Sequence, residues 1–269
     1  MIKALTPPLL VDLYRAAHPT GIVFRGSYKT WDDADKQATG YDADTILDRV
    51  RGAALRVKSG AASCERDSVI FMTPQYSFPL ITILLRVAQQ NGGRLTVLDF
   101  GGALGSSYYQ CRDFLDGVCA LRWCVVEQPK YVACGQREFQ NEVLSFFESV
   151  EACVAEVHPD VVLLSGVLQY LPEPIRLLDQ LAEIGAAFIV IDRTPIAACG
   201  KEVLSVQHVP AAIYRSSYPV WLFNEERLKT PLRTRYEEIA VFDAVDGELG
   251  QGRLKARFKG FIFRRKVEA

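Results

Sequence analysis

The chain has 269 residues, of which 49% are hydrophobic and 23% charged, and its 31 basic side chains nearly balance 32 acidic ones. This length and apolar content are enough for one α/β domain with a full core, or for a domain with an appendage. A net charge of -1 gives no field that would attract nucleic acid or an anionic membrane. No apolar run approaches the roughly 18–20 residues that cross a bilayer. We therefore expect no nucleic-acid partner and no membrane span, and the oligomeric state stays open.

The cysteine pattern favours a reducing compartment. There are seven cysteines, an odd number, and no Cys-x-x-Cys pair occurs. This disfavours both a disulfide framework and a structural zinc site, so we expect free thiols and no metal. The first ten residues hold a short apolar run with no basic segment before it and no small-residue cleavage site. The expected location is the cytoplasm.

The first part of the chain differs from the rest. Residues 26–42 are polar and carry Tyr28, Trp31 and Tyr41, and Thr30 is a suitable N-cap for a short helix that begins at Trp31. Apolar residues near helical spacing predict a second helix over 44–58 and a third over 78–90. We predict a helical and aromatic cap over residues 1–90 that leads into a core over residues 91–269.

From residue 91 onward, short apolar runs alternate with helical segments. The runs cover 95–99, 121–127, 143–147, 160–165 and 187–191, and the helices cover 107–115, 129–139, a stretch ending at about 157, and 174–184. This alternation predicts right-handed βαβ units and a parallel sheet covered on both faces. Two further strands, 236–245 and 257–264, lack a helix between them and predict an antiparallel hairpin. The expected fold is α/β and Rossmann-like, with a mostly parallel seven-stranded sheet.

A long insertion, at about residues 195–235, separates the fifth strand from the hairpin. It includes Tyr214, Tyr218 and Trp221. Long segments of this kind are often functional, so we expect substrate specificity to reside here.

The turn after the first core strand, Asp99-Phe-Gly-Gly-Ala-Leu-Gly105, is the expected ligand site. Ligands of open α/β sheets bind at the carboxyl ends of the strands, where the strand order reverses. A dinucleotide fold usually has Gly-x-Gly-x-x-Gly, but Ala103 and Ser106 stand at the third and sixth places counted from Gly101. Asp99 would also repel a pyrophosphate. S-adenosylmethionine (SAM) carries no phosphate, and its ammonium and sulfonium groups tolerate nearby anions.

An acidic residue, Glu127, ends the second core strand. A carboxylate at this place can accept hydrogen bonds from both ribose hydroxyls of an adenosine. Each hydrogen bond to a charged group contributes roughly 1.5–3 kcal/mol. Loss of the pair should weaken cofactor binding by about tenfold or more.

These motifs resemble those of the class I SAM-dependent methyltransferases. Leu98-Asp-Phe-Gly-Gly-Ala-Leu-Gly105 is similar to their first motif, Val126-Glu127 to the acidic residue that follows, and residues 160–171 to their fourth-strand motif. The resemblance implies SAM as the cofactor. The residues expected to bind it are Asp99, Gly101, Gly102, Gly105, Glu127, Gln128, Ser149, Ser165 and Gly166.

More narrowly, the chain resembles a family of methyltransferases encoded among bacterial surface-polysaccharide genes. The similar features are Gly26-x-Tyr28-x-x-Trp31-x-x-Ala34, Gly40-Tyr41-Asp42, Glu65-Arg66-Asp67, Val126-Glu-Gln-Pro129 and Ser165-Gly-x-Leu-Gln-Tyr170. Two positions depart from the general pattern. The middle glycine of the first motif is Ala103, and the third strand lacks the aspartate that commonly receives the adenine amino group, with Glu148 or Ser149 as the replacement.

Methyl transfer to a hydroxyl needs alignment, exclusion of water and a base. His208, after the fifth strand, is the first candidate for the base, and a structural histidine is the alternative. Tyr170 either positions the acceptor or packs over the methionine part of the cofactor. Arg193 either grips an anionic group of the substrate or forms a structural salt bridge. Tyr28, Trp31 and Tyr41 are expected in a lid over the substrate, with a purely structural cap as the alternative.

The leading hypothesis is therefore a SAM-dependent methyltransferase acting on a small hydroxylated acceptor, such as a sugar or nucleotide-sugar of surface polysaccharide. A non-catalytic SAM-binding or scaffold module with the same fold is the second hypothesis. A dinucleotide oxidoreductase is the third.

Overall fold

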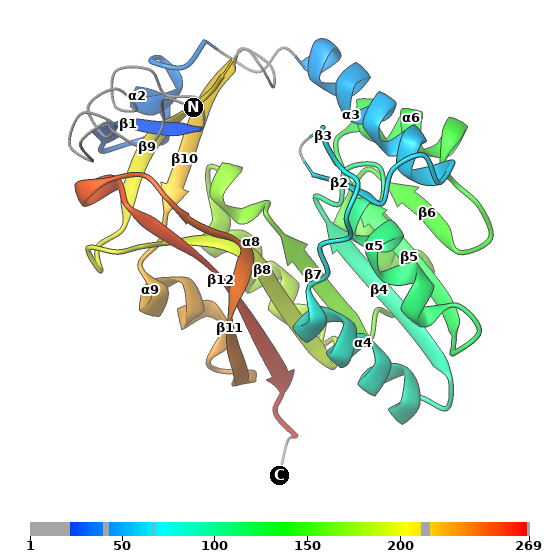
Figure 1. The fold of residues 1–269 in the computed structure, drawn as a ribbon. Coiled ribbons are helices and arrows are strands. Elements are labelled where there is room, and N and C mark those ends of the chain that lie inside the picture. The colour runs from blue at the N-terminus through cyan, green and yellow to red at the C-terminus, as the bar shows by residue number, and fades with distance from the viewer. Residues whose placement is uncertain (1–21, 40–42, 67, 211–215, 268–269) are drawn as a thin grey trace, which may run out of the picture.

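A computed structural model of the chain describes residues 22–39, 43–66, 68–210 and 216–267. Its main feature is a seven-stranded sheet in the order β11-β12-β8-β7-β4-β5-β6, in which β12 alone runs antiparallel to its neighbours (Figure 1). The strands are β4 (Arg94–Phe100), β5 (Ala120–Val126), β6 (Leu144–Phe147), β7 (Val161–Ser165), β8 (Phe188–Ala197), β11 (Tyr236–Leu249) and β12 (Ala256–Arg265). This is a Rossmann-like α/β arrangement with a mostly parallel seven-stranded sheet and a C-terminal antiparallel hairpin, so the predicted fold class is confirmed.

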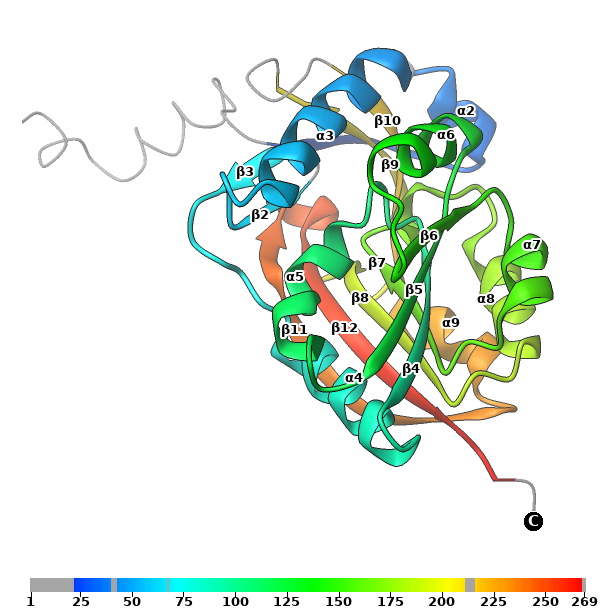
Figure 2. The ribbon, with the colours of Figure 1, turned by 90° about the vertical axis from the view of Figure 1, so that its right-hand side faces the viewer.

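The central strands are apolar on both faces because helices cover both. In β7, Val161 and Leu163 pack into one core cluster, while Val162 and Leu164 pack into the other, as the alternation of side chains along a strand requires. Figure 2 shows the helices on the two sides of the sheet. The first face carries α3 (Ala43–Lys58), α4 (Phe78–Gln90), α5 (Ser106–Leu115) and α6 (Pro129–Glu138), and the second carries α7 (Val150–Glu156), α8 (Pro174–Glu183) and α9 (Glu225–Lys229). The predicted core helices begin and end close to these bounds.

The strand order reverses at β4. The chain continues from β4 to β5 and β6 on one side, then crosses back to β7 and β8 on the other. The carboxyl ends of β4, β5 and β7 therefore flank a crevice that no crossover helix fills.

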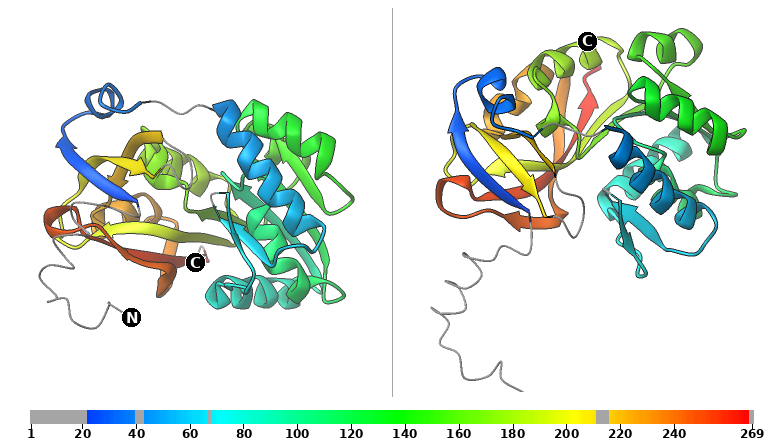
Figure 3. Two further views of the ribbon diagram at one scale, coloured as in Figure 1. Left: turned by 45° about the horizontal axis from the view of Figure 1, so that its top comes forward. Right: turned by 90° about the horizontal axis from the view of Figure 1, so that it is seen from above.

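A second, smaller sheet was not predicted. β1 (Val23–Tyr28) pairs antiparallel with β9 (Val203–Val209), which pairs with β10 (Ser216–Leu222). β1 and the insertion strands β9 and β10 thus form one unit. This unit lies on the side of β8 and the β11–β12 hairpin, opposite α3 and α6 (Figure 3). Although the division at residue 90 stays a prediction, β1 belongs with the insertion because the two share a sheet.

The rest of the N-terminal region combines the expected helices with a short hairpin. α2 (Trp31–Asp35) begins after Thr30, whose hydroxyl accepts a hydrogen bond from the backbone N–H of Asp33 at 3.2 Å, which confirms the predicted N-cap. The hairpin of β2 (Cys64–Arg66) and β3 (Val69–Phe71) precedes α4. Three single-turn 3₁₀ helices are η1 (Leu168–Tyr170), η2 (Thr230–Leu232) and η3 (Gly252–Leu254). Within the described ranges, no helix is both long and apolar enough to span a membrane.

Candidate active site

A cavity of about 940 Å³ opens at the carboxyl ends of β4, β5 and β7 and at the end of the parallel part of β8. Its volume lies near the top of the range of about 300–1,000 Å³ for small-molecule sites, so it can hold a cofactor and part of a second molecule. The turn after β4, the end of β5 and the turn after β7 line one part of it. The other part is lined by α2, the β2–β3 region, η1, Asp192 and Arg193 of β8, β10 and Val245 of β11.

The glycine turn after β4 has the conformation and the crowding that require glycine. Gly101 has φ of +72°, and a Cβ atom there would lie 2.3 Å from the side chain of Val167. A Cβ atom at Gly102 would lie 2.5 Å from Oδ2 of Asp99. Gly105, with φ of +93°, is the N-cap of α5. These glycines bring the backbone close to the cavity, which Gly101 and Gly102 line.

Asp99 lies beneath this turn and does not line the cavity, so the structure does not bring it there with the other residues predicted to bind the cofactor. Its side chain is fully buried, and Oδ2 accepts a hydrogen bond from Nε1 of Trp123 at 3.0 Å. Burial raises the pKa of Asp99 to about 7, although the Trp123 hydrogen bond opposes the shift. The sequence placed this carboxylate at the right turn but not at the right depth, because Gly102 packs directly over it.

Glu127 lies at the position predicted for a ribose ligand. It lines the cavity, and its Oε2 accepts a hydrogen bond from the backbone N–H of Gln128 at 2.7 Å. Burial raises the pKa of Glu127, while the backbone N–H groups of Gln128 and Ala103 donate to the carboxylate and oppose the shift. It forms no ion pair with any described residue. The carboxylate is therefore held beside the glycine turn and faces the cavity.

The remaining residues predicted to bind the cofactor also line the cavity. Gln128 precedes α6, and Ser149 is the N-cap of α7, where its hydroxyl accepts a hydrogen bond from the N–H of Ala152 at 3.1 Å. Ser165 ends β7, and Gly166 follows with φ of +70°. The ends of β4, β5, β6 and β7 thus bring these residues to one cavity, as the parallel sheet predicts.

Aromatic side chains form part of the opposite wall. Tyr170 and Tyr218 line the cavity, and their rings meet edge to face at 5.2 Å. The Tyr170 hydroxyl donates to Oε1 of Gln207 at 3.3 Å, and Nε2 of Gln207 donates to the Tyr218 hydroxyl at 3.0 Å. Trp31 also lines the cavity, whereas Tyr28 lies outside it, in the apolar cluster beneath α2. Of the two lid residues that the structure describes, Tyr28 and Trp31, only Trp31 lines the cavity.

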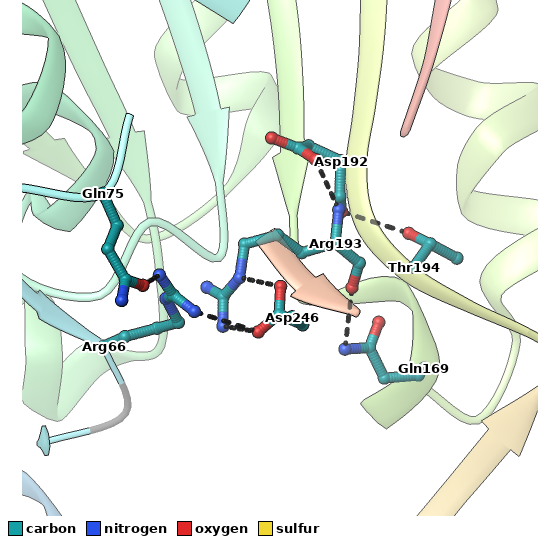
Figure 4. A network of polar contacts seen from close by, with 7 residues as sticks. All are labelled: Arg66, Gln75, Gln169, Asp192, Arg193, Thr194 and Asp246. Atoms are coloured by element: carbon teal, nitrogen blue, oxygen red, sulfur yellow. Dashed lines mark hydrogen bonds and ion pairs between the residues drawn. The ribbon is translucent and has the colours of Figure 1, made fainter. Parts of the chain in front are cut away.

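Arg193 lines the cavity and is ion-paired. Its Nε and Nη2 atoms contact Oδ2 and Oδ1 of Asp246 at 3.0 and 3.2 Å, and Nη1 of Arg66 contacts Oδ1 of Asp246 at 3.3 Å (Figure 4). Burial alone would raise the pKa of Asp246, but the two guanidinium groups hold it below its ordinary value. The salt-bridge alternative for Arg193 therefore describes the structure.

Asp192 is a cavity residue that sequence reasoning did not select. It is 2% exposed at the end of the parallel part of β8, directly opposite Ser165 of β7. Burial raises its pKa, and the backbone N–H of Arg193 donates to Oδ1 at 2.8 Å. The rule that located Asp99 and Glu127, a polar residue at the carboxyl end of a parallel strand, would also have found it.

His208 does not line the cavity, so the structure does not bring the predicted base to it. It lies in the middle strand of the small sheet, between Val23 of β1 and Ser217 of β10. Its neighbour Gln207 forms hydrogen bonds with the cavity residues Tyr170 and Tyr218. Because successive side chains of a strand point to opposite faces, the side chain of His208 points away from the cavity. Burial and then the charge of Arg25 lower the pKa of His208.

Five residues considered in the sequence lie outside the described residues. They are Tyr41 of the expected lid with Gly40 and Asp42 of the same Gly40-Tyr41-Asp42 motif, Asp67 of the Glu65-Arg66-Asp67 motif and Tyr214 of the insertion.

Comparison with known proteins gives matches only among solved structures, since no protein-family model and no curated protein matches the chain. The N-terminal domain of EvdMO1, with S-adenosylhomocysteine (SAH) and D-fucose, aligns with 84% of this chain and 98% of its own at 14% identity and TM-score 0.49. A 1,6-didemethyltoxoflavin-N1-methyltransferase of Burkholderia thailandensis aligns over 86% and 93% at 17% identity and TM-score 0.45. The sugar N-methyltransferase KedS8 from Streptoalloteichus sp. aligns over 70% and 87% at 16% identity and TM-score 0.43. At these values, what the site binds has to be inferred from the residues of this chain.

Proposed function

We propose that the protein is a SAM-dependent methyltransferase that acts on a small hydroxylated acceptor. The observation that carries the proposal is the Glu127 carboxylate, which faces the cavity beside the glycine turn and has no cationic partner among the described residues. A carboxylate in this position suits the two adjacent hydroxyls of a ribose.

The charges around the turn support SAM over a dinucleotide. Asp99 lies beneath Gly102, and Glu127 and Asp192 line the cavity on either side of the turn. Three carboxyl groups around one turn disfavour a pyrophosphate, while they tolerate a ligand that carries an ammonium and a sulfonium. Ala103, the departure from the usual motif, has φ of +51°, and its backbone N–H serves Glu127 rather than a phosphate.

The wall beyond the turn supports the class of acceptor. Trp31, Tyr170 and Tyr218 offer apolar rings, and Arg66, Gln75 and Asp192 offer charged and polar groups in the same space. Rings beside hydrogen-bonding groups suit a compact polyol, and a sugar or nucleotide-sugar of surface polysaccharide is the acceptor we propose. Bound SAM would supply a methyl group already activated by its sulfonium, so the protein has to orient the acceptor and exclude water.

Calorimetry with SAH tests the proposal. We expect the wild type to bind SAH, and Glu127→Ala to bind it about tenfold more weakly or worse, since two charge-assisted hydrogen bonds are lost. Glu142→Ala, which removes an exposed carboxylate outside the cavity, is the matched control. Absence of wild-type binding at millimolar SAH, or equal binding by Glu127→Ala, would exclude the proposed cofactor site. Cofactor binding without turnover on any acceptor would instead favour the non-catalytic module.

A further inference from the structure

The acceptor part of the cavity holds three carboxyl groups that differ in how they are used. Asp35 lies on α2 and is exposed to solvent. Glu65 is buried, and it already accepts hydrogen bonds from the Ser106 hydroxyl and from the N–H of Ser68. Asp192 is also buried, with a backbone hydrogen bond to Oδ1. Asp192 and Glu65 are thus the buried carboxyl groups of this part, and Asp192 is the one that the parallel sheet carries, since Glu65 lies on β2.

The sheet register fixes where Asp192 lies relative to that turn. Asp192 is directly opposite Ser165, and the N–H of Gly166 donates to the backbone oxygen of Asp192 at 3.0 Å. Since neighbouring strands lie about 4.8 Å apart, Asp192 is one strand away from the turn after β7 and two strands away from the glycine turn. A group on β8 is therefore placed beside a ligand that lies over the ends of β4 and β7.

The backbone around Asp192 is held in an uncommon conformation. Arg193 has φ of +53°, a region that costs a residue with a side chain about 1–2 kcal/mol. Three interactions fix this conformation (Figure 4). The Arg193 side chain forms the ion pair with Asp246, and Nε2 of Gln169 donates a hydrogen bond to the backbone oxygen of Arg193 at 3.4 Å. The Thr194 hydroxyl donates to the backbone oxygen of Asp192 at 3.2 Å. Backbone strain of this kind gathers at functional sites. It turns the N–H of Arg193 onto the Asp192 carboxylate and so orients it.

We propose that Asp192 is the catalytic residue that takes the proton from the acceptor, with Arg193 and Asp246 as positioning residues; this rests on the proposed function. As the bond between sulfur and the methyl carbon breaks, the acceptor oxygen bonds that carbon, and its proton passes to the Asp192 carboxylate. The products are SAH and a methyl ether, and the proton then leaves to water. The other groups nearby are less suited, because guanidinium groups stay protonated and a phenol is a poor proton acceptor near neutral pH. The acceptor must therefore be a group that loses a proton on methylation.

A binding experiment tests the placement of Asp192 without turnover. Sinefungin carries an ammonium-bearing carbon where SAM has its methyl-sulfonium, whereas SAH has a neutral sulfur there. If Asp192 faces the transferred methyl group, Asp192→Asn should weaken the binding of sinefungin by about tenfold or more. The reason is that the variant loses the negative charge that lies a few Å from the sinefungin ammonium. SAH should bind within about threefold of wild type. Asp113→Asn, at an exposed carboxylate on α5, is the control and should change neither affinity.

The outcomes separate the two proposals. A wild type that binds neither ligand removes the proposed function itself. Normal SAH binding with equal sinefungin affinities in wild type and Asp192→Asn overturns the role of Asp192, and so does an equal loss of both ligands. With methyl-labelled SAM and a set of free hexoses and nucleoside-diphosphate sugars, we expect Asp192→Asn to lower kcat by about 100-fold or more. An unchanged kcat with thermal stability preserved would overturn the proposal.

Discussion

Replacing Asp99 with asparagine removes a buried carboxyl group, and burial in the folded protein opposes the ionisation of that group. The side chain has no exposed surface, and Oδ1 accepts no hydrogen bond from the described residues. Burial raises the pKa from an ordinary 3.8 to about 7. At 1.36 kcal/mol for each pKa unit, ionising Asp99 in the folded protein costs about 4 kcal/mol relative to the unfolded chain.

The pH dependence has a definite sign. Because the pKa is higher in the folded protein, the folded protein holds this proton more tightly than the unfolded chain does. The resulting stability is fully present below about pH 4, falls as the pH rises and is lost above about pH 7. Asp99→Asn has no such proton, and its amide oxygen can still accept the hydrogen bond from Trp123. Its free energy of unfolding, relative to wild type, should rise by about 2.5 kcal/mol between pH 5 and pH 8.

Urea denaturation at pH 5, 6, 7 and 8 measures this difference. Groups that do not interact with Asp99 contribute equally to both proteins, so the difference isolates Asp99 together with its coupling to Glu127. Asp113→Asn changes an exposed carboxylate and should differ from wild type by a constant amount across the series. A difference between Asp99→Asn and wild type that stays constant with pH would refute the reasoning.

A fully buried, costly carboxylate also bears on function. Native sequences that keep such a group forgo stability that an amide would restore. At Asp99 the charge lies directly beneath Gly102, on the side of the turn away from the cavity. An anion there favours a cationic ligand above the turn, as the proposed cofactor is.

Two further predictions concern backbone conformation. Gly102→Ala should weaken SAH binding by about tenfold or more, because its Cβ would lie 2.5 Å from Asp99 Oδ2 and the turn must shift; calorimetry measures this, and wild-type affinity would contradict it. Arg193→Gly should be more stable than Arg193→Ala by about 0.5–1 kcal/mol in urea denaturation, because both lose the ion pair with Asp246 but only glycine relieves a φ of +53°. Equal stabilities of these two variants would show that the backbone at Arg193 is not strained.

The sequence predicted the large sheet because its signals are local. Buried runs such as Val161–Ser165 are apolar on both faces, and each ends at a turn that the next helix follows. The hairpin strands β11 and β12 lack an α-helix between them, which was enough to predict an antiparallel pair after the parallel strands. Residues at strand ends, Glu127 and Ser165 among them, then follow from topology alone.

The small sheet could not be predicted in the same way. β1 and β9 pair residues about 180 positions apart, as in Val23 with His208, and neither strand has the apolar run that marks a buried parallel strand. In β1 only Phe24 is fully buried, because the strand lies at an edge. Pairing at this separation leaves no trace in local spacing.

This difference explains why most residues predicted to bind the cofactor meet at the cavity, whereas the predicted base does not reach it. The residues around the glycine turn come from the ends of consecutive strand–helix units, where one rule places them all. The ion-pair network at the other wall joins Arg66, Arg193 and Asp246, which lie on three separate parts of the chain. His208 was chosen as a base from its residue type and its position after the fifth strand, and the pairing of β9 with β1 and β10 holds it away from the cavity. Asp192 needs no such long-range pairing, since the parallel sheet alone brings it beside Ser165. A base carried by the sheet is held as rigidly as the cofactor turn, and in-line transfer requires the two to keep a fixed separation.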